Sequence, residues 1–277
     1  MKTLNRKKVI RRLFIFVAAI NLIGWFAWMM ASSGDTPEAR DLGNMIWLVS
    51  PLLVSLLLRL FGKDWKDMGL KFKVFGNLRW YLFSLLFFPI LIAFVAAAGS
   101  AVGALDLSGI NSSTLLSAMA AAAGFTFVKN IFEEFSWRGY LTPKFDALGI
   151  KPIRAHLLTG LIWAAWHLPY YLGLLDPEIL ASSTALPIPL FITLTLASIT
   201  LAGILFGALR QITGSTWPAV LMHTVSNVIL TTLVTGGYIG VSTNLALVFS
   251  PGWEGLLMMA CITLAGFWLM RKQPAQS

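Results

Sequence analysis

The residues best suited to chemistry in this chain are two adjacent carboxylates with a basic partner: Glu133, Glu134 and Arg138. Glu134 and Arg138 are four residues apart, so on a helix they share one face and can neutralise each other. Glu133 lies about 100° around the helix from Glu134, and we predict that it is the freer of the two carboxylates. The structural alternative is an ion cluster that anchors the helix end, with Lys129 as the partner of Glu133.

Two further polar motifs interrupt apolar stretches later in the chain. Trp163 and His167 are four residues apart, and so are His223 and Asn227, so each pair projects from one face of a helix. His223 and Asn227 together offer two hydrogen-bond donors, which suits a carbonyl oxygen that becomes negatively charged during a reaction. The alternatives are a structural role for a buried His167 and hydrogen bonding between helices for His223 and Asn227.

The composition indicates where these groups lie. Of the 277 residues, 57% are hydrophobic and 12% are charged, whereas soluble domains carry about 25% charged residues. A helix needs about 20 apolar residues to cross the bilayer core, and spans are expected at 13–30, 45–58, 80–102, 114–132, 157–174, 188–209, 217–234 and 255–270. The predicted fold is an all-α, polytopic transmembrane bundle of about eight spans, the second of them short. An ionisable group inside such a span is a functional candidate by default, because its insertion costs about 2.5–3.5 kcal/mol at a helix centre.

The charges predict the orientation of the bundle. With eight spans, nearly all of the 21 Lys and Arg residues lie in the terminal segments and loops on one side. The positive-inside rule then places both termini in the cytoplasm. The net charge of +9 therefore reflects orientation, and we expect no nucleic-acid partner. The polar motifs are expected to converge on one cavity in the cytoplasmic half of the membrane, and Gly203 and Gly207 predict close helix packing.

The order of these motifs on successive helices resembles the CAAX protease and bacteriocin-processing (CPBP, or Abi) family, which includes the type II CAAX prenyl endopeptidases. The motifs stand here as Glu133-Glu134-x-x-x-Arg138, Trp163-x-x-x-His167 and His223-x-x-x-Asn227. Trp163 occupies a position where the pattern often has Phe. The resemblance covers residues 114–234 and extends to the last span, which predicts N-terminal transmembrane helices at 1–113 and a catalytic core at 114–277.

The resemblance implies an intramembrane endopeptidase that hydrolyses a peptide bond of a membrane-associated peptide or protein, lipidated or of leader type. It implies that Glu133 is the general base, assisted by His167, in the activation of a water molecule. It also implies that His223 and Asn227 bind the oxyanion. The structural and orienting residues are then Glu134, Arg138 and Trp163.

Other functions remain open from the sequence. A zinc-dependent version of the protease would use His167, His223 and Glu133 as ligands, but it leaves only Glu134 as a base, and the chain has no H-E-x-x-H motif. We therefore expect no cofactor, with zinc as the alternative. A proton-coupled carrier and a non-catalytic immunity or scaffold protein are the other candidates.

The expected partners are the lipid bilayer and a peptide or protein substrate, with the oligomeric state open. The expected location is the cytoplasmic membrane of a prokaryote, although an endoplasmic reticulum protein would obey the same charge rule.

Overall fold

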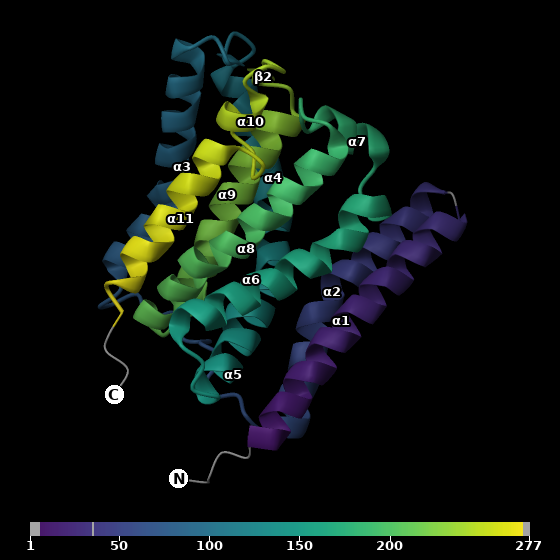
Figure 1. Ribbon diagram of the computed structural model, residues 1–277, viewed down its shortest axis with the longest axis vertical. Coiled ribbons are helices and arrows are strands. Elements are labelled where there is room, and N and C mark those ends of the chain that lie inside the picture. Colours follow the sequence, from purple (N-terminus) through teal and green to yellow (C-terminus); the bar gives the residue numbers. More distant parts are fainter. Residues whose placement is uncertain (1–5, 35, 274–277) are drawn as a thin grey trace.

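The computed structural model describes residues 6–34 and 36–273 and consists almost entirely of helices (Figure 1). In chain order its elements are α1 (Arg6–Gly34), α2 (Pro37–Gly62), α3 (Leu78–Ala101), β1 (Leu105–Asp106), α4 (Ser112–Ser136), the π-helical turn η1 (Trp137–Leu141), α5 (Thr142–Ala147), α6 (Pro152–Pro169), the π-helical turn η2 (Tyr170–Leu174), α7 (Pro177–Ser182), α8 (Ile188–Thr213), α9 (Trp217–Thr235), β2 (Gly240–Val241), α10 (Ala246–Phe249) and α11 (Leu256–Met270). The prediction of an all-α bundle is confirmed.

Each of the eight expected spans coincides with a helix, and six helical segments of the described chain are long and apolar enough to cross a membrane. These six are Arg6–Gly34, Pro37–Gly62, Leu78–Ala101, Ser112–Ala147, Ile188–Thr213 and Trp217–Thr235. The second is not short, because α2 has 26 residues. In contrast, α11 has 15 residues, and α6 ends after 18 residues, where η2 begins. The chain is therefore a multi-pass membrane protein, and the count of eight spans stays a prediction.

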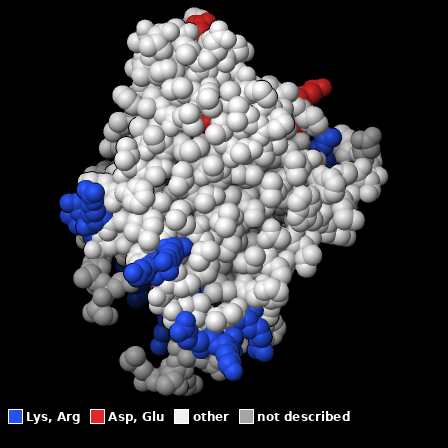
Figure 2. Space-filling view, viewed as in Figure 1, with Lys and Arg blue, Asp and Glu red and all other residues white. Residues whose placement is uncertain are grey.

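The two ends of the bundle differ in charge. Figure 1 places the start of α1, the end of α11 and the turn between α5 and α6 at one end, and β2, α7 and α10 at the other. Most of the Lys and Arg residues visible in Figure 2 gather at the first end, whereas the visible Asp and Glu residues lie toward the second. We call these the basic end and the acidic end. Their separation matches the expected charge asymmetry, and the cytoplasmic location of the basic end stays a prediction.

Residues 63–77, the loop between α2 and α3, cover the basic end. Asp67 binds Arg59 of α2 at 2.5 Å and Lys144 of α5 at 3.0 Å. Burial alone would raise the pKa of Asp67, but these two cations outweigh burial and hold its pKa below the ordinary value. Thr216, just before α9, donates to the carbonyl of the buried Met68 at 2.8 Å. The loop is thereby tied to α2, α5 and α9 together.

Small residues let α6 and α8 pack closely. A Cβ atom added at Gly203 would lie 2.6 Å from the carbonyl oxygen of His156, and one added at Gly207 would lie 2.1 Å from the His156 ring. On the facing helix, a Cβ atom at Gly160 would lie 2.2 Å from the carbonyl oxygen of Thr200. The close packing predicted from Gly203 and Gly207 is confirmed. It fixes the axial position of α6 relative to α8.

We expect the substitution Gly160→Ala to lower the melting temperature of the detergent-solubilised protein. Alanine favours a helix over glycine by about 1 kcal/mol, but the added methyl group meets backbone atoms of Thr200, and overpacking of this kind costs about 1–3 kcal/mol. Gly124→Ala is the matched control, because Gly124 lies within α4 and its Cβ position has no neighbour within 4 Å. A melting temperature that changes equally in both variants would contradict the close contact.

Candidate active site

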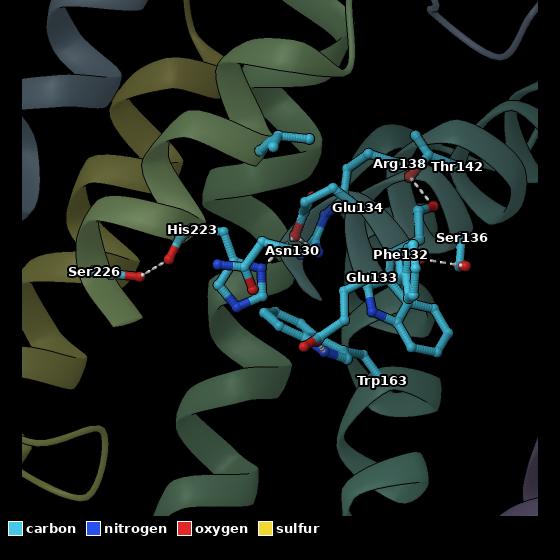
Figure 3. A network of polar contacts seen from close by, with 12 residues as sticks. Asn130, Phe132, Glu133, Glu134, Ser136, Arg138, Thr142, Trp163, His223 and Ser226 are labelled. Atoms are coloured by element: carbon cyan, nitrogen blue, oxygen red, sulfur yellow. Dashed lines mark hydrogen bonds and ion pairs between the residues drawn. The ribbon is translucent and has the colours of Figure 1, made fainter. Parts of the chain in front are cut away.

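The three polar motifs come together where α4, α6 and α9 face one another. Glu133 and Glu134 end α4, Trp163 lies on α6, and His223 lies on α9 (Figure 3). Both glutamates are fully buried, and His223 is only 3% exposed. His167 of α6 is 8% exposed. The predicted convergence of these residues is therefore present. Their burial keeps these polar groups away from the lipid.

Glu134 connects the first motif to the third. Its Oε1 atom accepts hydrogen bonds from Arg138 Nη1 and from His223 Nδ1, each at 2.9 Å (Figure 3). The ion pair with Arg138 was predicted from the four-residue spacing, whereas the bond to His223 was not. The guanidinium of Arg138 also lies over the rings of Trp163 and Phe206, at 4.4 and 4.7 Å from their centroids. These contacts place the cation against α6 and α8 as well as against Glu134.

The backbone changes from an α-helix to a π-helical turn just before Arg138. Residues Trp137–Leu141 form η1, a single π-helical turn between α4 and α5. Such turns insert one extra residue into a helix and are frequent at functional sites. η1 begins three residues after Glu134, and within it Arg138 pairs with Glu134 while the chain continues to the basic end.

Glu133 is held as firmly as Glu134. Its Oε1 accepts from Lys129 Nζ at 2.7 Å, and its Oε2 accepts from the indole nitrogen of Trp163 at 2.9 Å. The prediction that Glu133 is the freer carboxylate is wrong, since both of its oxygens have donors. The helical spacing showed Lys129 as a partner, but the reach of Trp163 from α6 depends on the packing of two helices. The side chain of Lys129 is 25% exposed, so this donor has room to move.

Both histidines are oriented through Nδ1. The Nδ1 atom of His167 lies 2.9 Å from the carbonyl oxygen of Trp163, and that of His223 lies against the Glu134 carboxylate. Because a carbonyl oxygen can only accept, the Nδ1 atom of His167 carries the proton, and in the neutral ring Nε2 is then an acceptor. The indole of Trp163 lies between the two rings, edge-on to both, at centroid distances of 5.9 and 5.3 Å.

Asn227 is oriented by a residue that sequence reasoning missed. Its Nδ2 donates to Oδ1 of Asn130 at 3.2 Å, and the fully buried Asn130 donates in turn to Thr224 at 3.5 Å. Asn130 is a polar residue within an apolar span, next to Lys129, and that position could have drawn attention to it.

A cavity of about 250 Å³ lies beside these residues, and its wall includes Lys129, Trp163, His167, His223 and Asn227. Glu133 is behind this wall, covered by Lys129 and Trp163. The remaining lining residues come from α2, from η2 and α7 with the residue that follows each, from the parts of α8 and α9 nearer the acidic end, and from the segment before α11. The cavity therefore extends from the motifs toward the acidic end, and the placement of the motifs in the cytoplasmic half of the membrane stays a prediction.

The N-terminal helices contribute to the site, which their sequence did not indicate. Trp47 of α2 lines the cavity and donates from its indole to the carbonyl of Trp166 at 2.8 Å. It stacks on the rings of Trp166 and Tyr170, at centroid distances of 3.9 and 4.7 Å. An aromatic wall therefore joins α2 to the end of α6.

The alternative zinc site is not assembled in this structure. Hydrogen bonds from Nδ1 to a carboxylate and to a carbonyl are typical of metal-binding histidines, and both His167 and His223 have them. In this structure both oxygens of the third donor, Glu133, accept hydrogen bonds from Lys129 and Trp163. Across the described parts of the chain, no three His, Cys, Asp or Glu side chains are grouped so that they could hold a metal ion.

Comparisons with known proteins place this site in a family. Residues 112–229, which contain all three motifs, match the family model described as type II CAAX prenyl endopeptidase Rce1-like. A search of curated proteins with the whole chain finds no significant match. Members of the matched family are proteases, which implies a peptide or protein substrate at the membrane. The match over residues 112–229 therefore supports a relationship of this part of the chain to the CPBP/CAAX protease family.

Proposed function

We propose that this protein is an intramembrane endopeptidase in which Glu133 and His167 activate water and His223 and Asn227 stabilise the oxyanion. The observation that carries the proposal is that His167, His223 and Asn227 line the inner end of one cavity, with the fully buried Glu133 directly behind its wall. The family match supports the reaction type, and the contacts of each residue support its role.

Water activation requires Lys129 to move. Glu133 is shielded from the cavity by Lys129, whose side chain lines the cavity and is partly exposed. When the ammonium turns toward the cavity, a water molecule takes its place between Glu133 and Nε2 of His167. The carboxylate accepts one proton of this water, and the hydroxide attacks the carbonyl carbon of the peptide bond. Glu133 then transfers the proton to the departing amine, so that the carboxylate is regenerated.

The oxyanion is stabilised by donors that face the same space. Asn227 has two amide protons, of which one bonds to Asn130, and the other is available to the substrate oxygen. His223 lines the same space, and Glu134 holds its ring at Nδ1. Glu134 is thus a positioning residue for His223, and Arg138 positions Glu134 in turn.

We expect Glu133→Gln and Glu134→Gln to differ in stability. Glu133→Gln keeps an acceptor for Trp163 and leaves Lys129 free to turn outward, so the melting temperature should stay near the wild-type value. Cleavage should fall by about 10²–10⁴-fold, the usual contribution of a general base.

Glu134→Gln leaves the fully buried Arg138 without a counter-charge, and loss of one partner in a buried pair costs about 3–5 kcal/mol. Peptide cleavage and thermal melting measured on both variants test this; wild-type cleavage by Glu133→Gln would contradict the assignment.

Removal of the amide at position 227 should slow turnover without weakening substrate binding. We expect Asn227→Leu to lower kcat by about 10²–10³-fold, as found for single oxyanion donors, with KM little changed. Thr231→Val is the matched control, because Thr231 lines the same cavity one helical turn farther along α9. Steady-state kinetics with lipidated and leader-type peptides in liposomes measure both values. Equal losses of kcat in the two variants would show a general effect of polarity in the cavity and would contradict the role of Asn227 as an oxyanion donor.

The proposed mechanism uses protein groups alone, so cleavage should survive treatment with a zinc chelator. We expect the purified protein to retain its rate after incubation with chelator and removal of bound metal, as measured by peptide cleavage. Loss of activity that is restored by added zinc, but not by magnesium, would favour the zinc-dependent alternative with His167, His223 and Glu133.

A further inference from the structure

We propose that the substrate reaches the candidate active site from the acidic end of the bundle, as an extended apolar peptide segment on the non-cytoplasmic side of the membrane. The term substrate rests on the proposed proteolytic function. The direction of access rests on separate observations, namely the course of the cavity, the position of its mouth and the closure of the opposite end.

The cavity follows one face of two helices from the motifs to the acidic end. On α8 its wall contains Phe191, Thr195 and Ile199, which are four residues apart. On α9 it begins at His223 and ends at Thr235, a rise of about 18 Å at 1.5 Å per residue. A peptide bond placed at the motifs therefore has its flanking chain directed along α8 and α9 toward that end.

The mouth of the cavity is formed by elements of the acidic end. Ile179 and Ser183 line it from α7 and the residue that follows, and Trp253 lines it from the segment before α11. Ile179 is 47% exposed, and Thr231 and Thr235 of α9 are also exposed. Figure 1 shows α7 at the end away from the start of α1 and the end of α11.

The basic end is closed. Met68 of the 63–77 loop is buried against Phe135 and Val220, and the carbonyl of Gly69 accepts from the backbone of Thr216 at 3.0 Å. Arg210 donates to the carbonyl of Asp67 at 2.7 Å. Among the described residues, none from the loop 63–77, the turn 148–151 or the loop 214–216 lines the cavity. Because the positive-inside rule places these basic loops in the cytoplasm, the open end faces the other side.

The wall of the cavity favours an apolar, extended occupant. Aromatic rings from Trp47, Tyr170, Tyr171, Phe191 and Trp253 line it, and Lys129 is its one Lys or Arg within the described chain. The carboxyl group of Glu254 lines the outer part and is 2% exposed. Burial raises the pKa of Glu254, so this carboxyl group adds less negative charge to the wall than an exposed one would.

Cysteine labelling from each side of the membrane tests the direction of access. Cys261 is the single cysteine of the chain, and Cys261→Ala provides a background for Leu230→Cys, in the cavity wall, and for Lys151→Cys, exposed at the basic end. A small, membrane-impermeant methanethiosulfonate reagent is applied to right-side-out and to inverted membrane vesicles. We expect Leu230→Cys to react at least tenfold faster in right-side-out vesicles, and Lys151→Cys to react faster in inverted vesicles.

Two results would overturn the proposal: reaction of both cysteines from the same side, or no reaction of Leu230→Cys from either side. Reaction of Lys151→Cys in right-side-out vesicles would also overturn the non-cytoplasmic assignment. The labelling does not depend on cleavage, so these outcomes are separate from the loss of activity that tests the proposed function in Glu133→Gln.

Discussion

The Glu134 carboxylate, which binds both Arg138 and His223 within an apolar bundle, is the interaction on which the site depends. A buried guanidinium is tolerated only with a counter-charge, because an uncompensated charge costs several kcal/mol in a low-dielectric interior. Glu134 provides that charge at 2.9 Å and orients His223 with the same oxygen atom. Since Arg138 also covers Trp163 and Phe206, one ion cluster fixes α4, α6, α8 and α9 relative to one another.

This constraint explains why the bundle can be closed at one end and open at the other. The cluster and the 63–77 loop hold the helices together toward the basic end, where Met68 packs against Phe135 and Val220. Toward the acidic end, aromatic side chains such as Trp47 and Tyr170 keep the helices apart by stacking along a wall. Polar groups for chemistry therefore lie at the boundary between the two halves, where water can reach them without crossing the whole bundle.

The sequence predicted those features that depend on spacing along one helix, and it failed for those that depend on the register between helices. The pairs Glu134–Arg138 and Lys129–Glu133 follow from a four-residue separation, and the structure confirms both. The bonds of His223 to Glu134 and of Trp163 to Glu133 require a particular height of one helix against another, which no local pattern encodes. The sequence did not predict the direction of the cavity for the same reason. That direction depends on how the neighbouring helices pack along α8 and α9.

The central claim, that this cluster hydrolyses peptide bonds with an activated water, is tested most directly by following the oxygen atom. Purified wild-type protein in liposomes is incubated with a mixture of lipidated and leader-type peptides in water labelled with the heavy oxygen isotope, and the products are analysed by mass spectrometry. We expect each new C-terminal carboxylate to carry one heavy oxygen atom, and Glu133→Gln to form this product about 10²–10⁴-fold more slowly. Intact peptides accompanied by substrate-dependent proton flux would contradict the central claim and would favour a carrier.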